Sequence, residues 1–425
     1  PAPGSRAQLE AATARLHEGM LDRDRPLWQY TLIEGLDNGD VALHCKIHHA
    51  ALDGQGGVAL AHATLDSTPD APAVTAKDAP AARRPPGAAR LLSQALRNSV
   101  AQYGRIIQAV PGALKSVGAA GAALLSSSQA RKAGAPTEQG RGIPELAGIN
   151  PADSPEQAAR SLLKKIPGGI TLGPRTALNV AIGGKRAFAG LRIPLAEAKA
   201  LARHFDAKLN DIVMAQCAGA LARHLAASGA SPAKSLVAAI PVSLRMPGDT
   251  SQSNQVTMML VDLATRIADP RKRLAAILKS SGKAKLLTGA TKDVIPTDMP
   301  SLGMPWLMSV LTPLYKSAVA SNRIPVVANL FISNVPGPQQ PLYLAGAELT
   351  EYYPVSIVTH GLALNITIQS YNGSLDFGFI ACKKALPKPR QFAAHLKAAH
   401  EELMELMHRE SAPAAPRAAK SRRKR

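Results

Sequence analysis

Apolar and polar residues alternate with a period of two in two neighbouring stretches near the start of the chain, "PLWQYTLIEGL" (residues 26–36) and "VALHCKIHH" (residues 41–49). This period is typical of strands, and "DNGD" between the two stretches is a turn sequence. We therefore predict a hairpin. The apolar face of its second strand consists of Val41, Leu43, Cys45 and Ile47.

The other face of that strand carries His44 and Lys46 and is polar. If the period continues, His49 points toward the apolar face and His48 toward the polar one. A histidine that faces an apolar wall either makes a satisfied hydrogen bond in the core or takes part in chemistry.

Helical and strand-like patterns alternate along the rest of the chain. We expect helices at residues 8–20, 54–65, 195–205, 210–225 and about 389–408. We expect strands at residues 185–194, 235–245, 254–263, 326–338 and within 354–380. Both halves of the chain contain strands and helices. This mixture predicts an α/β fold with mixed sheets (α+β).

A Pro- and Ala-rich stretch, residues 67–87, interrupts these patterns and predicts a linker. An amphipathic helix is expected after it, with Arg90, Arg97 and Arg105 on its basic face. Its apolar positions are Leu92, Leu96, Val100, Tyr103, Ile107 and Val110. This helix either packs on its own domain with its arginines in water or docks on an anionic membrane or lipid droplet surface.

The charge of the chain is concentrated in two segments. The formal net charge is +20, but residues 79–137 hold eight basic residues and no acid, and residues 411–425 hold six more, again with no acid. These fourteen charges leave 20 − 14 = +6 for the rest of the chain. The folded body is therefore ordinary in charge. Apart from "KSRRKR" in the tail, no feature indicates nucleic acid binding, because aromatic residues are only 4% and no nucleic-acid motif is present.

Composition limits the location of the protein. No apolar run approaches the length of about 20 residues needed to span a bilayer, so we expect a soluble or peripheral protein. Three cysteines far apart, Cys45, Cys217 and Cys382, favour a reducing compartment. The chain opens on Pro1 without a secretory pattern, and we expect its first elements to be missing.

The stretch "HHAALDG" (residues 48–54) can carry several chemistries. His44, His48, His49 and Asp53 are residue types that bind zinc, but on a strand His44 and His48 point away from His49. Cys45 and His49 share a face, yet four strand residues separate them by roughly 13 Å, too far for proton transfer, so Cys45 is expected to pack. His49 as a single general base and His49 as a structural residue both remain open.

Further segments carry a resemblance that bears on this choice. "HHAALDG" looks like the HHxxxDG signature of CoA-dependent acyltransferases related to chloramphenicol acetyltransferase and to condensation domains. Together with six other segments, it resembles the bacterial wax ester synthase/diacylglycerol acyltransferase family from residue 22 to about residue 380. The six are "DRPLWQYTLIEGL", "GPRTALN", "KLNDIVMA", "IPVSLR", "SNVPGP" and "HGLALNITIQSYNG".

The resemblance implies two chloramphenicol acetyltransferase-like domains with the reaction centre in a tunnel between them. It implies that His49 is the general base, His48 its supporting neighbour and Asp53 a structural residue beside Gly54. Asn210 and Asp211 match an Asn-Asp motif implicated in activity, although a helix cap would also account for them. Pro26, Leu27 and Trp28 are expected to be structural or to line the tunnel, with Asn334 in support. "LDFGF", which holds Asp376 and Gly378, resembles a segment of related plant enzymes that is generally structural.

The implied domains are residues 1–66, an N-terminal acyltransferase domain expected to lack its first elements, and residues 173–410, a C-terminal acyltransferase domain. Residues 67–172 form the linker with the basic helix, and residues 411–425 a basic disordered tail.

The resemblance implies transfer of a fatty acyl group from acyl-CoA to diacylglycerol or a long-chain alcohol, without metal, cofactor or covalent intermediate. A cytoplasmic enzyme is expected, peripherally bound to the inner membrane face or to lipid inclusions. Two alternatives stay open: acyl transfer from a carrier protein, and a non-catalytic coat protein of lipid droplets.

Overall fold

The computed structural model describes residues 2–49, 54–71, 87, 89–94, 96–98, 172–243, 256–291, 305–322 and 324–411. Asp53, most of the predicted linker and almost all of the predicted tail lie outside these residues.

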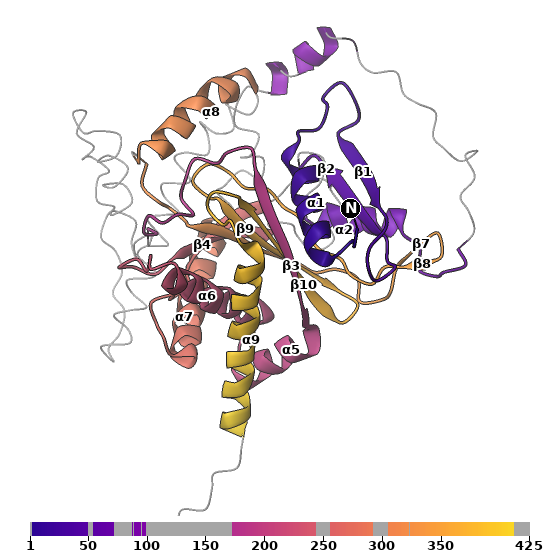
Figure 1. The fold of residues 1–425 in the computed structure, drawn as a ribbon. Helices are drawn as coiled ribbons and strands as arrows, with labels where there is room; N and C mark the ends of the chain where they lie inside the picture. The colour runs from indigo at the N-terminus through magenta and orange to yellow at the C-terminus, as the bar shows by residue number, and fades with distance from the viewer. Residues whose placement is uncertain are drawn as a thin grey trace, which may run out of the picture.

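A six-stranded mixed sheet forms the centre of the molecule (Figure 1). Its strand order is β3 (Arg186–Pro194), β10 (Ser374–Cys382), β9 (Leu364–Tyr371), β6 (Leu330–Val335), β4 (Val237–Ser243) and β5 (Val256–Asp262). Strand β6 runs parallel to β4 and β9, and the other pairs are antiparallel. The predicted α/β fold with mixed sheets is confirmed.

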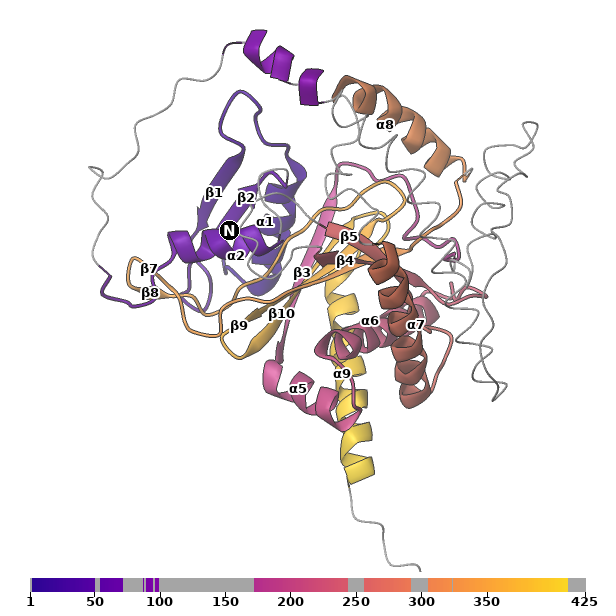
Figure 2. The ribbon, with the colours of Figure 1, turned by 180° about the vertical axis from the view of Figure 1, so that it is seen from behind.

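A layer of helices covers one face of this sheet (Figures 1 and 2). It consists of α5 (Leu195–His204), α6 (Leu209–Ala227), α7 (Pro270–Thr291) and α9 (Pro389–Ser411). Helix α6 is buried continuously from Asp211 to Leu221, because α7, α9 and the sheet enclose it, and it therefore lacks the single apolar stripe of a surface helix. Its core partners on the sheet include Leu364, Ile366 and Ile368.

The N-terminal elements lie on the other side of the sheet (Figures 1 and 2). They are α1 (Arg6–Glu18), β1 (Trp28–Ile33), β2 (Ala42–Ile47) and α2 (Gly54–Thr64). Ala14 of α1 packs in one cluster with Phe188 of β3 and Ile380 of β10, so α1 covers the sheet face opposite the helix layer. Burial of such apolar surface contributes about 25 cal/mol per Å².

Two carboxylates of α1 cover the free edge of β3. The Oε1 atom of Glu10 accepts a hydrogen bond from the Gly190 N–H (3.1 Å), and that of Glu18 from the Arg186 N–H (3.0 Å). Eight residues of helix span about 12 Å and four of strand about 13 Å, so the two spacings match. This arrangement satisfies edge amides that would otherwise offer a site for another strand.

The hairpin forms as predicted, but its buried face is the opposite of the predicted one. Leu43 is 40% exposed and Cys45 is exposed, whereas His44 is only 9% exposed. The polar face packs on α1, because Lys46 donates hydrogen bonds to the carbonyl groups of Leu16 (2.9 Å) and Gly19 at the end of that helix. The assignment of Cys45 to packing is therefore wrong.

The long strand-like stretch at residues 354–380 contains a tight hairpin. Strands β9 and β10 are joined at Asn372 and Gly373, which both have positive φ (40° and 77°), as a type I′ turn requires. Residues 354–363 precede the strands and form no long strand themselves.

Helices α7 and α8 (Pro305–Ala320) and the small hairpin β7 (Tyr343–Leu344) with β8 (Ala347–Glu348) were not expected from the sequence. Within the described ranges, no helix combines the length and the apolarity needed to cross a membrane.

Candidate active site

The histidine pair lies where β2 ends. Strand β2 stops at Ile47, and His49 lies in the turn that follows. The predicted continuation of the strand pattern to His49 is therefore wrong. Both His48 and His49 are exposed. The backbone N–H of His48 donates to the Leu27 carbonyl (2.9 Å), and Trp28 pairs with Ile47 in the ladder. The structure thus brings Pro26, Leu27 and Trp28 to the histidine pair.

The side chain of Trp28 is 57% exposed and its ring packs on that of Tyr30, with centroids 5.4 Å apart. Leu27 is also exposed. Gly54 begins α2, as the predicted helix start at the end of the motif requires. Asp53, the predicted structural aspartate, lies outside the described residues.

A buried, uncharged histidine lies just before the pair. Burial, reinforced by the nearby Lys46 charge, lowers the pKa of His44. His17 on α1 shares this environment: burial, with Lys46, Arg186 and His44 close by, lowers its pKa to about 4. At this contact between the hairpin and α1, the two histidines are therefore disfavoured in their charged form, and Lys46 supplies the positive charge.

The predicted Asn-Asp motif divides into two roles. Asp211 is buried near the start of α6, where its Oδ2 accepts a hydrogen bond from the Lys208 N–H (3.3 Å) and its Oδ1 one from the Ser281 hydroxyl (2.8 Å). The Nζ of Lys285 lies 3.7 Å from the same Oδ1. Asp211 therefore caps α6 and joins it to α7. Sequence reasoning missed Ser281 and Lys285, because it predicted no helix there.

Asn210 is exposed beside Asp211 and accepts a hydrogen bond from the Nδ2 of Asn334, at the end of β6. The structure thus brings Asn210 and Asn334 together as a pair of carboxamides. They extend from α6 and β6, whereas His48 and His49 extend from the N-terminal hairpin.

Two of the resemblance segments meet in a buried amide network. Asn179 of "GPRTALN" donates to the carbonyl groups of Ala328 (3.0 Å) and Gly361 (2.9 Å) and accepts from Asn329 (2.8 Å). Every one of these bonds is internal to the protein. The network therefore fixes the start of β6, and with it the position of Asn334.

"LDFGF" also has a structural role. Asp376 is fully buried and forms two bonds with Arg192, Nε to Oδ1 at 2.8 Å and Nη2 to Oδ2 at 3.1 Å, while accepting the Tyr352 N–H (2.9 Å). A Cβ atom at Gly378 would lie 1.8 Å from the Pro354 carbonyl oxygen. Both residues hold the segment around residues 350–354 against the sheet.

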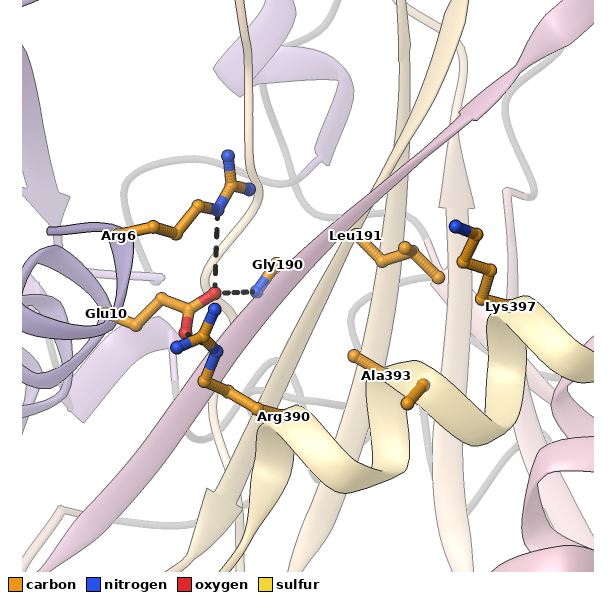
Figure 3. A pocket seen from close by; sticks show the side chains of 8 residues that line it. Arg6, Glu10, Gly190, Leu191, Arg390, Ala393 and Lys397 are labelled. Atoms are coloured by element: carbon orange, nitrogen blue, oxygen red, sulfur yellow. Dashed lines mark hydrogen bonds and ion pairs between the residues drawn. The ribbon is translucent and has the colours of Figure 1, made fainter. Parts of the chain in front are cut away.

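A pocket of about 150 Å³ lies between α1, β3 and α9, and Figure 3 shows Arg6 and Arg390 beside Glu10, with Lys397 farther along α9. Each of these cations has a carboxylate partner: Arg390 with Glu10 (3.3 Å), Arg6 with Glu351 (2.8 Å) and Lys397 with Glu401 (3.9 Å). The first two pairs fasten α1 to α9 and to the segment around Glu351, whereas the third lies within α9.

Among the described residues, which exclude Asp53, no three His, Cys, Asp or Glu side chains form a group that could hold a metal ion.

Two family models match the chain. The model of the wax ester synthase/diacylglycerol acyltransferase catalytic domain matches residues 1–213, and that of the WS/DGAT C-terminal domain matches residues 252–404.

Individual relatives agree with these matches. A Mycobacterium tuberculosis protein named as a diacylglycerol O-acyltransferase is 34% identical over 405 residues, which are 95% of this chain and 79% of the relative. A Mycobacterium bovis protein named in the same way is 33% identical over 408 residues, with the same shares covered. The solved wax ester synthase/diacylglycerol acyltransferase from Marinobacter aquaeolei VT8 is 27% identical with a TM-score of 0.58, covering 96% of this chain and 78% of that one.

Proposed function

Because the chain belongs to the wax ester synthase/diacylglycerol acyltransferase family and is an acyltransferase, we propose that it moves a fatty acyl group from acyl-CoA to diacylglycerol or a long-chain alcohol. The observation that carries this proposal is the exposed histidine pair at the end of β2, inside the segment matched by the catalytic-domain model.

In the proposed reaction, His49 takes the proton of the acceptor hydroxyl while the oxygen attacks the thioester carbonyl carbon. The new C–O bond gives a tetrahedral oxyanion, which collapses, breaks the C–S bond and releases the thiolate of coenzyme A. The thiolate then takes up the proton held by His49. A thiol with a pKa near 8.5 is a good leaving group, so the transfer needs neither a covalent intermediate nor a cofactor.

The other site residues support this step. The backbone bond between His48 and Leu27 fixes the start of the turn that carries His49. General-base catalysis is worth about 10² to 10⁴ in rate, and positioning of the two substrates must supply the rest. We assign Asp211 to holding α6 in place and the Asn210–Asn334 pair to the polar surroundings of the substrates.

Lipid substrates imply work at a lipid surface, and the basic segments suit peripheral contact with an anionic membrane or lipid inclusion. In the part of the basic helix that the structure describes, Leu91, Leu92 and Leu96 are all exposed. Helical geometry places Arg90 and Arg97 on the opposite side from these leucines, an amphipathic arrangement that suits an interfacial helix.

The test of this function is ester formation from palmitoyl-CoA with diacylglycerol and hexadecanol as parallel acceptors. We expect triacylglycerol, wax ester or both, with one coenzyme A thiol released per ester formed. Thiol release that is independent of any acceptor would indicate a thioesterase instead, and palmitate transfer only from a carrier protein would replace the acyl-CoA donor.

A further inference from the structure

Strand β9 is buried on both faces, although only one of them is apolar. Its even-numbered residues Leu364, Ile366 and Ile368 belong to the core beneath the helix layer. The alternate residues Asn365, Thr367 and Gln369 form a polar stripe on the other face and are only 5%, 7% and 4% exposed. A polar strand face normally meets water, so a buried one calls for partners or a ligand.

Two members of this polar stripe satisfy each other within the protein. The Thr367 hydroxyl donates to the Oδ1 of Asn365 (2.9 Å). The Nδ2 of Asn365 donates to the Ser356 hydroxyl (3.2 Å) and to the Ile357 carbonyl (2.9 Å). Their burial is therefore explained by the fold.

Gln369 differs from its two neighbours. Within the part of the chain that the structure describes, its Nε2 is buried and has no hydrogen-bond partner. A Cβ atom on Gly337 would lie 2.1 Å from this nitrogen, so glycine at that position is what leaves room for the carboxamide. A buried donor without an acceptor is costly, and a ligand that supplied an acceptor would offset this cost.

The polar stripe lies on the sheet face that the N-terminal elements cover. Ala14 of α1 packs on this face, and His17 of the same helix lies close to the backbone of Ser356, whose hydroxyl contacts Asn365. Lys46 ties the same helix to β2, two residues before His48. One series of contacts therefore connects the histidine hairpin to the polar stripe.

We infer that the buried carboxamide of Gln369 binds a carbonyl oxygen of a substrate. The inference rests on the proposed function, because acyl transfer supplies the ligand. An uncharged N–H donor suits a neutral acceptor such as a carbonyl group. Two substrates offer one: the thioester of the acyl donor and the esters of diacylglycerol.

The test compares Gln369→Met, which keeps the length of the side chain but removes the donor, with Gln339→Met. Gln339 is an exposed glutamine whose amide already donates to the Gly337 carbonyl and the Ser370 hydroxyl, which makes it a matched control. Because Nε2 has no described partner, Gln369→Met should keep the wild-type Tm within about 2 °C or raise it. It should also raise a substrate KM by about fivefold to tenfold.

The two acceptors identify the carbonyl group. Hexadecanol has no carbonyl, so a raised KM for palmitoyl-CoA with hexadecanol as acceptor assigns the contact to the donor thioester. A raised KM confined to diacylglycerol assigns it to the acceptor ester.

Two outcomes overturn the inference. One is unchanged kinetics with both acceptors, and the other is a Tm lowered by more than about 5 °C with normal kinetics of the folded enzyme, which would make Gln369 structural. Absence of ester formation by the wild-type chain would refute the proposed function instead.

Discussion

Asp376 shows how one residue holds a large segment in place. Its carboxylate is fully buried, yet it binds Arg192 through two atoms and accepts a backbone N–H from Tyr352. The Arg192 side chain is 32% exposed, so loss of the carboxylate charge would weaken charge-assisted hydrogen bonds and leave a guanidinium that water can partly reach.

Asp376→Asn should therefore lower the free energy of unfolding by about 1.5 to 3 kcal/mol. Asp206→Asn is the control, since Asp206 is exposed with a positive φ that asparagine tolerates, and it should change stability by less than about 0.5 kcal/mol. Urea unfolding of both variants provides the comparison. Equal stabilities would show that the Arg192 pair contributes nothing.

His17 makes the stability of the fold depend on pH. Burial lowers its pKa to about 4 in the fold, against about 6.5 in an unfolded chain. Between these values the unfolded chain binds the extra proton, so the free energy of unfolding falls as the pH drops from 6.5 toward 4 and is independent of His17 above that range.

His17→Gln removes this titration and keeps a polar side chain close to the Ser356 backbone. We expect the variant to lose less stability than the wild type between pH 6.5 and 4.5, by at most about 1.4 kcal/mol per pH unit. Part of the dependence should remain, because burial also lowers the pKa of His44. Urea unfolding at several pH values measures the difference, and identical pH profiles would contradict the assignment.

At the scale of elements, α1 connects the two sides of the molecule. It covers the free edge of β3 through Glu10 and Glu18, and it receives β2 through Lys46. The position of the histidine hairpin therefore depends on the contact between α1 and β3.

Replacing both Glu10 and Glu18 by alanine should expose the amides of Arg186 and Gly190. Hydrogen exchange followed by mass spectrometry should show faster exchange in peptides from β3, with little change in the central strand β9. Glu401→Ala, on the exposed side of α9, should leave β3 protected. Unchanged protection of β3 in the double variant would mean that the carboxylates do not cover this edge.

The alternation of residues in the hairpin predicted both strands and which side chains share a face, but not which face is buried. That choice depends on where α1 docks, and the bond from Lys46 to the end of α1 is a contact between segments far apart in the sequence. The same limit applies to β9. Its alternation of apolar and polar residues predicts one solvent-exposed face, whereas both faces are buried in the structure.

The candidate site was predictable only in part. The histidine pair and the Asn-Asp motif can be recognised as short motifs in the sequence. A hairpin in this region also implies that Pro26–Trp28 lie close to the histidines. The different roles of Asn210 and Asp211 depend on Ser281, which donates a hydrogen bond to Asp211. Ser281 lies on α7, a helix whose sequence has no clear periodicity of apolar residues. The burial of Gln369 depends on the approach of Gly337, which local patterns do not encode.

At the scale of the whole molecule, charge is separated from the folded body. The six basic residues of the tail lie in residues 417–425, beyond the end of α9 at Ser411. Each basic residue close to an anionic surface contributes about 1 kcal/mol to binding, and salt screens this contribution.

Removal of residues 412–425 should weaken binding to vesicles containing anionic phospholipid by at least about tenfold at low salt, with a smaller effect at high salt. A chain with the same tail residues in scrambled order should bind like the wild type, because charge and not sequence drives the contact. Vesicle sedimentation measures both. Unchanged binding of the truncated chain at low salt would show that the tail does not contribute to membrane binding.

In the proposed mechanism a single histidine, His49, serves as the base for direct acyl transfer. The most direct test is the turnover of His49→Ala with palmitoyl-CoA and the better acceptor, beside His62→Ala as a control on the exposed side of α2. We expect a loss of about 10² to 10⁴ in kcat for His49→Ala with an unchanged Tm, and wild-type turnover for His62→Ala. Turnover of a folded His49→Ala enzyme within a few-fold of the wild type would contradict it.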